Sequence, residues 1–67
     1  METVQGMVEH IVYHNDENGY TVFQISVNGS EVTCVASMPA LDEGEYMSLE
    51  GEYITHKVYG RQFRVSS

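Results

Sequence analysis

Apolar and polar residues alternate along most of this chain, which is the pattern of strands with one buried face. In residues 20–27, for example, Phe23 and Ile25 alternate with Gln24 and Ser26. The same alternation recurs in residues 32–38, 45–55 and 61–65. We therefore predict strands and turns throughout.

Residues 3–14 form the longest predicted strand, and both of its faces are apolar in turn. One parity carries Val4, Val8 and Val12, and the other carries Met7, Ile11 and Tyr13. A strand of this kind bends or bulges partway along and serves two parts of a curled sheet. Gly6 is the expected position of the bend.

Turn-forming residues separate the predicted strands. The first loop, residues 15–19, ends in Asn18-Gly19, and Asn28-Gly29 marks a tight hairpin, because these residues tolerate positive φ. Pro39 ends the third strand, since proline has no N–H to donate. The connector 39–44 has room for one helical turn at most, and residues 56–60 make the last loop.

Five consecutive strands, a long bent first strand and a break between the third and fourth strands predict an all-β fold. We expect a small five-stranded antiparallel Greek-key barrel of the OB type, with no substantial helix between strands three and four. Closure of the sheet is favoured because it removes exposed strand edges. An SH3-like barrel or an open meander is the structural alternative.

The length of 67 residues allows one domain, residues 1–67, with no spare interior for a deep cofactor cavity. Cys34 is the only cysteine, so a disulfide within the chain and a multi-cysteine zinc site are excluded, and we predict no metal site. No apolar run reaches the roughly 20 residues of a membrane span, and the segment after Met1 lacks the features of a secretory signal. We therefore expect a cytoplasmic protein without a membrane partner.

Charge is distributed unevenly. All lysines and arginines lie within residues 57–64, whereas every acidic residue precedes them, and the formal net charge is −7. Binding of duplex DNA over the whole surface is disfavoured, because its affinity comes from neutralised phosphates. The basic and aromatic stretch still permits weak, salt-sensitive contact with single-stranded DNA, since flat rings stack on bases.

Four blocks carry a resemblance to a known family. They are Gly6-x-Val8-Glu9, residues 15–22 (NDENGYTV), residues 49–53 (LEGEY) and residues 56–63 (HKVYGRQF). Together they resemble the N-terminal OB domain of RecD-like ATP-dependent DNA helicases, the RecD/TraA-type relatives of the exodeoxyribonuclease V alpha subunit. The resemblance covers nearly the whole chain.

That resemblance implies a place before a helical region and two motor domains that use ATP and Mg²⁺ to move along single-stranded DNA. We therefore expect this chain to be the N-terminal part of a longer helicase. The nearest approach to a phosphate-binding loop, residues 51–58, has His56 where glycine is needed and Val58 where the metal-binding hydroxyl belongs. No catalytic role and no cofactor are expected for the chain itself.

The last loop and strand supply the candidate nucleic-acid-binding residues, which are His56, Lys57, Tyr59, Arg61 and Arg64. Their rings would stack on bases and their cations would contact phosphates. In the alternative interpretation, Lys57 and Tyr59 only close a hairpin. The arginines would then pair with Glu50 or Glu52 across the sheet.

The first loop supplies a candidate partner-binding surface, made of Asp16, Glu17, Asn18 and Tyr20. Its acidic side chains would repel phosphates, so a protein partner suits it better. We expect a non-catalytic OB module that guides single-stranded DNA or docks on the motor. The alternative is a module that recruits a DNA-repair protein without contacting DNA.

Overall fold

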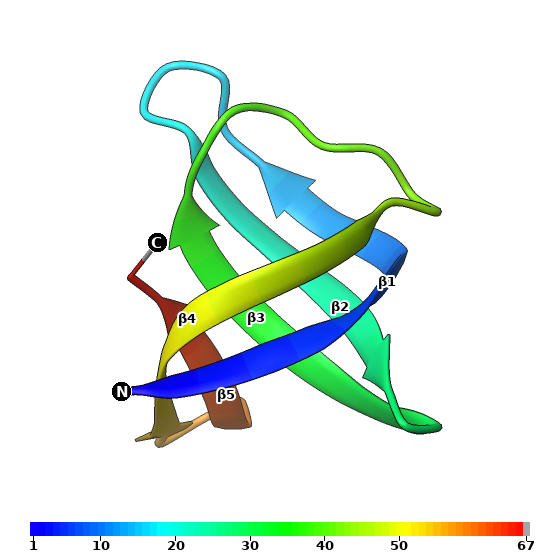
Figure 1. Cartoon of the computed structure of the whole chain (residues 1–67). Coiled ribbons are helices and arrows are strands. Elements are labelled where there is room, and N and C mark those ends of the chain that lie inside the picture. The colour runs from blue at the N-terminus through cyan, green and yellow to red at the C-terminus, as the bar shows by residue number, and fades with distance from the viewer. Residues whose placement is uncertain (67) are drawn as a thin grey trace.

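The computed structural model describes residues 1–66, which fold into five strands and no helix. The strands are β1 (Glu2–His14), β2 (Tyr20–Val27), β3 (Ser30–Ser37), β4 (Tyr46–His56) and β5 (Gly60–Val65). They close into a barrel in the order β1-β2-β3-β5-β4 (Figure 1). The predicted all-β, five-stranded barrel of the OB type is thus confirmed. Within residues 1–66 there is no helix long and apolar enough to cross a membrane.

The closing ladder of the barrel differs from the expected antiparallel pairing. Four ladders are antiparallel, but β3 and β5 run parallel and pair at Cys34–Phe63 and Val35–Arg64. The reason is topological, because a ring with an odd number of strands cannot alternate direction at every step. Towards their N-terminal ends the two strands diverge (Figure 1).

The long strand β1 serves two neighbours, as predicted, but its irregularities lie beyond Gly6. Residues 2–7 pair with β4, and residues 7–14 pair with β2. The register with β2 shifts twice, between Val8 and His10 and between Ile11 and Tyr13. Gly6 instead permits a close approach, since a Cβ there would overlap the carbonyl oxygen of Ser26.

These two bulges determine which side chains of β1 face the interior. The inward-facing pairs of β1 and β2 are Val8–Ile25, Ile11–Phe23 and His14–Thr21. From one inward-facing pair to the next, the chain therefore advances three residues along β1 but only two along β2. As a result Val12, which shares its parity with Val8, is 54% exposed.

The core is small and almost entirely apolar. Its buried members are Val4, Val8, Phe23, Ile25, Cys34, Ala36, Leu49 and Phe63. Phe63 meets the ring of Tyr53 edge-on, with ring centroids 5.0 Å apart. The thiol of Cys34 is buried as a core side chain, and this burial raises its pKa from 9.0 to about 12. It therefore stays protonated and is a poor nucleophile.

The segment between β3 and β4 closes one end of the barrel without forming a helix, as predicted. Val8 N–H donates to the Glu45 carbonyl oxygen and Gly44 N–H to the Val8 carbonyl oxygen, both at 2.7 Å. Met38 N–H donates to the Gly19 carbonyl oxygen at 3.0 Å, so the loop 15–19 lies at the same end (Figure 1). Leu41 packs against the core from this segment. The loop 57–59 lies at the opposite end.

Candidate nucleic-acid interface

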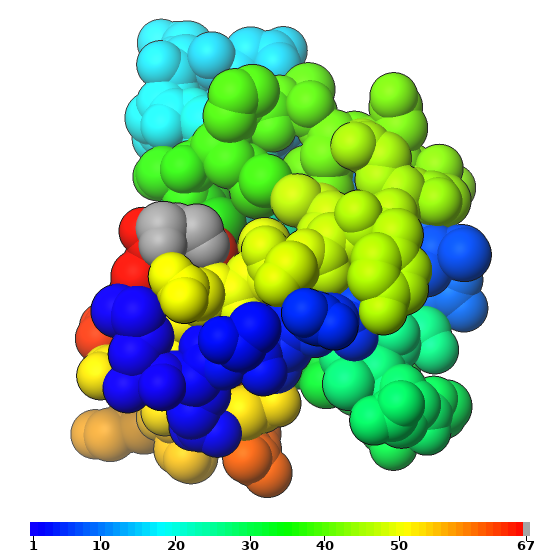
Figure 2. Space-filling model, in the orientation of Figure 1, coloured from blue at the N-terminus to red at the C-terminus, as the bar shows by residue number. Residues whose placement is uncertain are grey.

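A groove crosses the outer surface of β2 and β3, between the loops 15–19 and 57–59. Its volume is about 550 Å³, and three tyrosines line it, namely Tyr13, Tyr20 and Tyr59. The other lining residues are Val12, Val22, Gln24, Thr33 and Gln62. Val22 and Gln24 face outward, because they alternate along β2 with the buried residues Thr21, Phe23 and Ile25. Figure 2 shows the loop 15–19 standing out from one end of the molecule.

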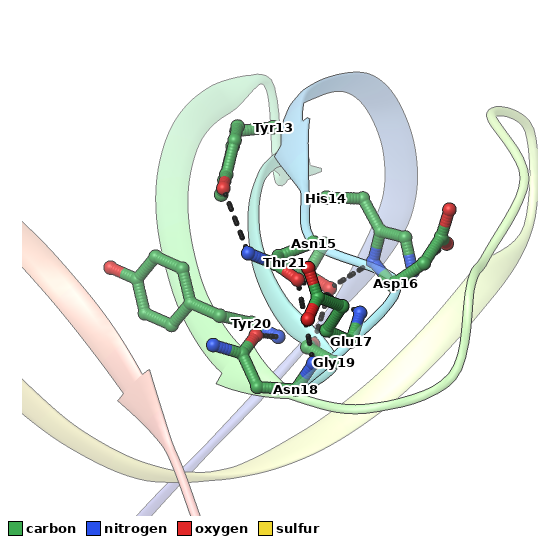
Figure 3. Close-up of polar contacts among 9 residues, drawn as sticks. All are labelled: Tyr13, His14, Asn15, Asp16, Glu17, Asn18, Gly19, Tyr20 and Thr21. Atoms are coloured by element: carbon green, nitrogen blue, oxygen red, sulfur yellow. Dashed lines mark hydrogen bonds and ion pairs between the residues drawn. The ribbon is translucent and has the colours of Figure 1, made fainter.

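Side-chain hydrogen bonds shape the loop 15–19 (Figure 3). The Asn15 side-chain oxygen accepts the Glu17 N–H at 2.8 Å and the Asn18 N–H at 3.4 Å. The Asn18 side-chain oxygen accepts the Tyr20 N–H at 2.9 Å. Gly19 completes the turn with φ +76, a conformation that glycine adopts without strain. Asn15 and Asn18 therefore set the direction in which Tyr20 leaves the loop.

Tyr13 and Tyr20 project on the same side of this loop. Their ring centroids are 6.3 Å apart, and the Tyr13 hydroxyl accepts the Asn15 side-chain N–H at 3.2 Å. Asp16 lies beside His14, on the side away from the two rings (Figure 3). Its carboxylate, 93% exposed, is 3.1 Å from His14 Nε2. Asp16, one of the two acidic side chains that were expected to repel phosphate, thus points away from the tyrosines.

The loop 57–59 presents Tyr59. The His56 ring nitrogen Nδ1 accepts the backbone N–H groups of Val58 at 3.0 Å and of Tyr59 at 3.2 Å. The two rings lie 4.8 Å apart between centroids, and the Tyr59 side chain remains largely exposed. His56 therefore shapes the turn that carries Tyr59 to the groove.

The two arginines of β5 point to different parts of the surface, since they have opposite parity. The Arg61 guanidinium carbon lies 4.0 Å above the Tyr53 ring, in a separate hollow between the diverging ends of β3 and β5. Arg64 Nη2 is 3.6 Å from Glu52 Oε2, which realises one of the cross-sheet pairs considered from sequence. Arg64 also lines a shallow hollow with Tyr20. Lys57 is exposed in the loop.

The structure thus divides the residues selected from sequence. It brings Tyr20 and Tyr59 into one groove. Arg64 lines a shallow hollow that Tyr20 also lines, and Arg61 lies in another hollow. Asp16, Glu17 and Asn18 stay in the exposed first loop. The residues that sequence reasoning missed are Val12, Tyr13, Val22, Gln24, Thr33 and Gln62. The signal for Val22 and Gln24 was present, because they occupy the outward parity of the second strand.

No cluster of three or more histidine, cysteine or acidic side chains that could hold a metal ion occurs within residues 1–66. The two histidines of β1, which could have been metal ligands, make local contacts instead. His10 Nδ1 lies 3.5 Å from Glu43, and His14 is bonded within its own loop.

Comparison with known proteins places the chain in a family. The family model described as "ATP-dependent DNA helicase YrrC, OB-fold domain" matches residues 1–67. No match was found among solved structures. The predicted relation to the OB domains of RecD-like helicases is confirmed at the level of this family. Because the match covers residues 1–67 and the chain folds into the five-stranded barrel expected for it, the chain belongs to the OB-fold domains of the YrrC ATP-dependent DNA helicases.

Proposed function

We propose that this domain guides single-stranded DNA to or from the motor of a RecD/TraA-type helicase related to the exodeoxyribonuclease V alpha subunit. An OB-fold domain of a helicase is a non-catalytic module that binds nucleic acid or other domains. ATP and Mg²⁺ would be used by motor domains elsewhere in the parent protein. The proposed setting is cytoplasmic DNA repair and recombination.

The groove with three tyrosines is the observation that carries this proposal. OB barrels bind oligonucleotides on the surface of strands two and three, between the loops that join strands one to two and four to five. The groove has this position. Each base stacked on an aromatic ring contributes about 1–3 kcal/mol. The strand would therefore be held by stacking, with no covalent bond made or broken.

The cations at the rim of the groove have a secondary role in this proposal. Lys57 lies in the loop that presents Tyr59, and Arg64 lines a shallow hollow together with Tyr20. Both are exposed and would contact phosphates weakly, so binding would be salt-sensitive to a small degree. His56 would act indirectly, by shaping the loop. Arg61, over the Tyr53 ring, would contact DNA only where the strand extends past the far end of the barrel.

The experiment measures binding of fluorescent single-stranded oligonucleotides by anisotropy at low salt. We expect Tyr20→Ala and Tyr59→Ala each to weaken binding by about 5- to 150-fold, the equivalent of one lost stack. Tyr46→Ala is the matched control, since Tyr46 is 70% exposed but lies on β4, outside the groove. If the unaltered chain shows no affinity at low salt, the domain by itself is not a strand-binding module.

Docking on the motor or on a repair protein is the second candidate, and the charge favours it. The net charge is −7, and the carboxylate of Asp16 is 93% exposed. An acidic surface of this kind complements a basic protein surface. Docking should survive when Lys57, Arg61 and Arg64 are changed to alanine. It should weaken when Asp16 and Glu17 are changed to asparagine and glutamine.

A further inference from the structure

The wall of the barrel is open between the first halves of β3 and β5. The ladder that joins these two strands has only the pairs Cys34–Phe63 and Val35–Arg64. Before these pairs the strands diverge, and a hollow of about 370 Å³ lies between them (Figure 1). Within residues 1–66, the start of β3 (residues 30–33) therefore pairs with β2 on one side and leaves a free strand edge on the other.

The register of β3 with β2 shows which backbone groups face this hollow. The turn 28–29 has positive φ at both residues, so the flanking residues 27 and 30 are the hydrogen-bonded pair that closes the hairpin. Hydrogen-bonded and non-hydrogen-bonded pairs alternate from there, and Glu31 and Thr33 belong to the second kind. Their N–H groups therefore point away from β2 and towards the hollow. A free edge of this kind is a template for an added strand.

The floor of the hollow is apolar and carries one cation. Val27, Val32 and Tyr53 line the hollow, are partly buried, and pack against the core. Arg61 has the same parity on β5 as the buried Phe63, and its guanidinium carbon lies 4.0 Å above the Tyr53 ring. Arg61 forms no ion pair among residues 1–66. A side chain that entered the hollow from an added strand would therefore meet apolar walls and then an unpaired guanidinium group.

We propose that an extended segment of a partner protein adds to the free edge of β3 and places a glutamate side chain against Arg61. Backbone carbonyl oxygens of the segment would accept the Glu31 and Thr33 N–H groups, as in other strand additions. The glutamate methylenes would cover Val32, and the carboxylate would form a charge-assisted pair with the guanidinium. The Glu31 side chain has the opposite parity to Val32, so it faces away from this floor.

A protein segment suits this edge better than a nucleic acid does. A peptide backbone repeats its donors and acceptors with the spacing of a strand ladder, whereas a phosphodiester backbone has no N–H groups to continue one. The surface is also separate from those in the proposed function. Among the described residues that line the groove, only Thr33 lines the hollow as well, and docking through the loop 15–19 does not need Arg61.

The test titrates the 67-residue chain with two end-capped peptides and follows binding by nuclear magnetic resonance. One peptide is Thr-Val-Thr-Glu-Thr-Val-Thr, and the other has glutamine in place of glutamate. The glutamate peptide should bind about three- to tenfold more tightly, as expected for a partly exposed charged pair. Arg61→Gln should remove this difference between the peptides. Lys57→Gln is the matched control, since Lys57 is an exposed cation outside the hollow, and it should keep the difference.

Hydrogen exchange tests the backbone contact. With the glutamate peptide at about ten times its Kd, exchange of the Glu31 N–H should slow by about tenfold. The Val32 N–H should change little, because it is already bonded to β2. Glu31→Pro removes the donor at a strand edge, where proline is tolerated, and should weaken binding by about two- to tenfold relative to Glu31→Gln.

Equal affinity of the two peptides, or no added protection of the Glu31 N–H, overturns the proposal. No binding of the glutamate peptide at millimolar concentration overturns it too. If single-stranded oligothymidylate shifts the signals of Glu31 and Arg61 and displaces the peptide, the hollow binds DNA and the proposal is wrong. The first three outcomes leave the proposed function intact, because strand binding in the groove is measured separately through Tyr20 and Tyr59.

Discussion

Thr21 is the one polar residue that is fully buried within residues 1–66, and its hydroxyl joins three parts of the first loop. The hydroxyl donates to the Gly19 carbonyl oxygen at 2.9 Å. It lies 2.7 Å from His14 Nδ1. Both contacts share this one hydroxyl group, and the direction of the hydrogen bond with His14 Nδ1 follows the tautomer of the ring. The loop that carries Tyr20 is therefore fixed to the barrel through one hydroxyl group.

Replacing Thr21 with valine should lower the free energy of unfolding by about 1–3 kcal/mol. Valine fills nearly the same volume but leaves the Gly19 carbonyl and His14 Nδ1 without their partner, which costs about this much for buried groups. Urea denaturation measures the effect. Thr3→Val is the control, because Thr3 is an exposed strand residue whose substitution should change stability by no more than about 0.5 kcal/mol. Equal stability of the two variants would show that the hydroxyl contacts do not hold the loop.

At the scale of elements, the strands follow from the alternation of side chains, but the bulges in β1 do not. Sequence indicated that β1 must change faces, and Gly6 was the expected position. The prediction of that position is wrong, since the shifts lie between Val8 and His10 and between Ile11 and Tyr13. The position of a bulge depends on the register with the partner strand, which the residues of β1 alone do not give.

Gly6 has a different role, which is to allow the close approach of β1 and β2. The direction in which a substitution at this position changes the free energy of unfolding tests that role. Alanine in a strand is normally more favourable than glycine by about 0.5–1 kcal/mol. A Cβ at position 6 would overlap the backbone carbonyl of Ser26, which cannot move without disturbing β2. Gly6→Ala should therefore lower the unfolding free energy by about 1–3 kcal/mol, the usual cost of overpacking.

Thermal and urea unfolding measure this change, with Ser48→Ala as the control. Ser48 is an exposed residue of β4 beside the same part of β1, so its substitution tests the strand without the close approach. A gain of stability in Gly6→Ala would mean that β1 and β2 are not as close at this point as the structure places them.

At the scale of the whole molecule, the candidate site was only partly predictable, because a groove depends on how strands close. Sequence identified Tyr20 and Tyr59 separately, as members of different loops. It did not join them with Tyr13, since closure of the sheet and the two bulges decide where that ring points. It also grouped Arg61 with Arg64, although alternate positions of β5 point to different surfaces.

The net charge of −7 on so small a body predicts how stability depends on salt. The radius of gyration is 11.0 Å and the longest extent is 29 Å. At 0.01 M salt the Debye length of about 30 Å spans the molecule, so every acidic group repels the others, whereas about 8 Å at 0.15 M leaves only neighbours interacting. Unfolding moves the charges apart, so repulsion at low salt favours the unfolded chain.

The free energy of unfolding, measured with urea, should therefore rise as NaCl is increased from 0.01 to 0.15 M. NaCl is preferred to sulfate, which strengthens apolar burial by itself. A variant with Glu2, Glu9 and Glu31 changed to glutamine should gain less from salt, because three exposed acidic charges are gone. A fall in stability with salt would mean that attractive pairs such as Arg64–Glu52 outweigh the excess of acidic charge.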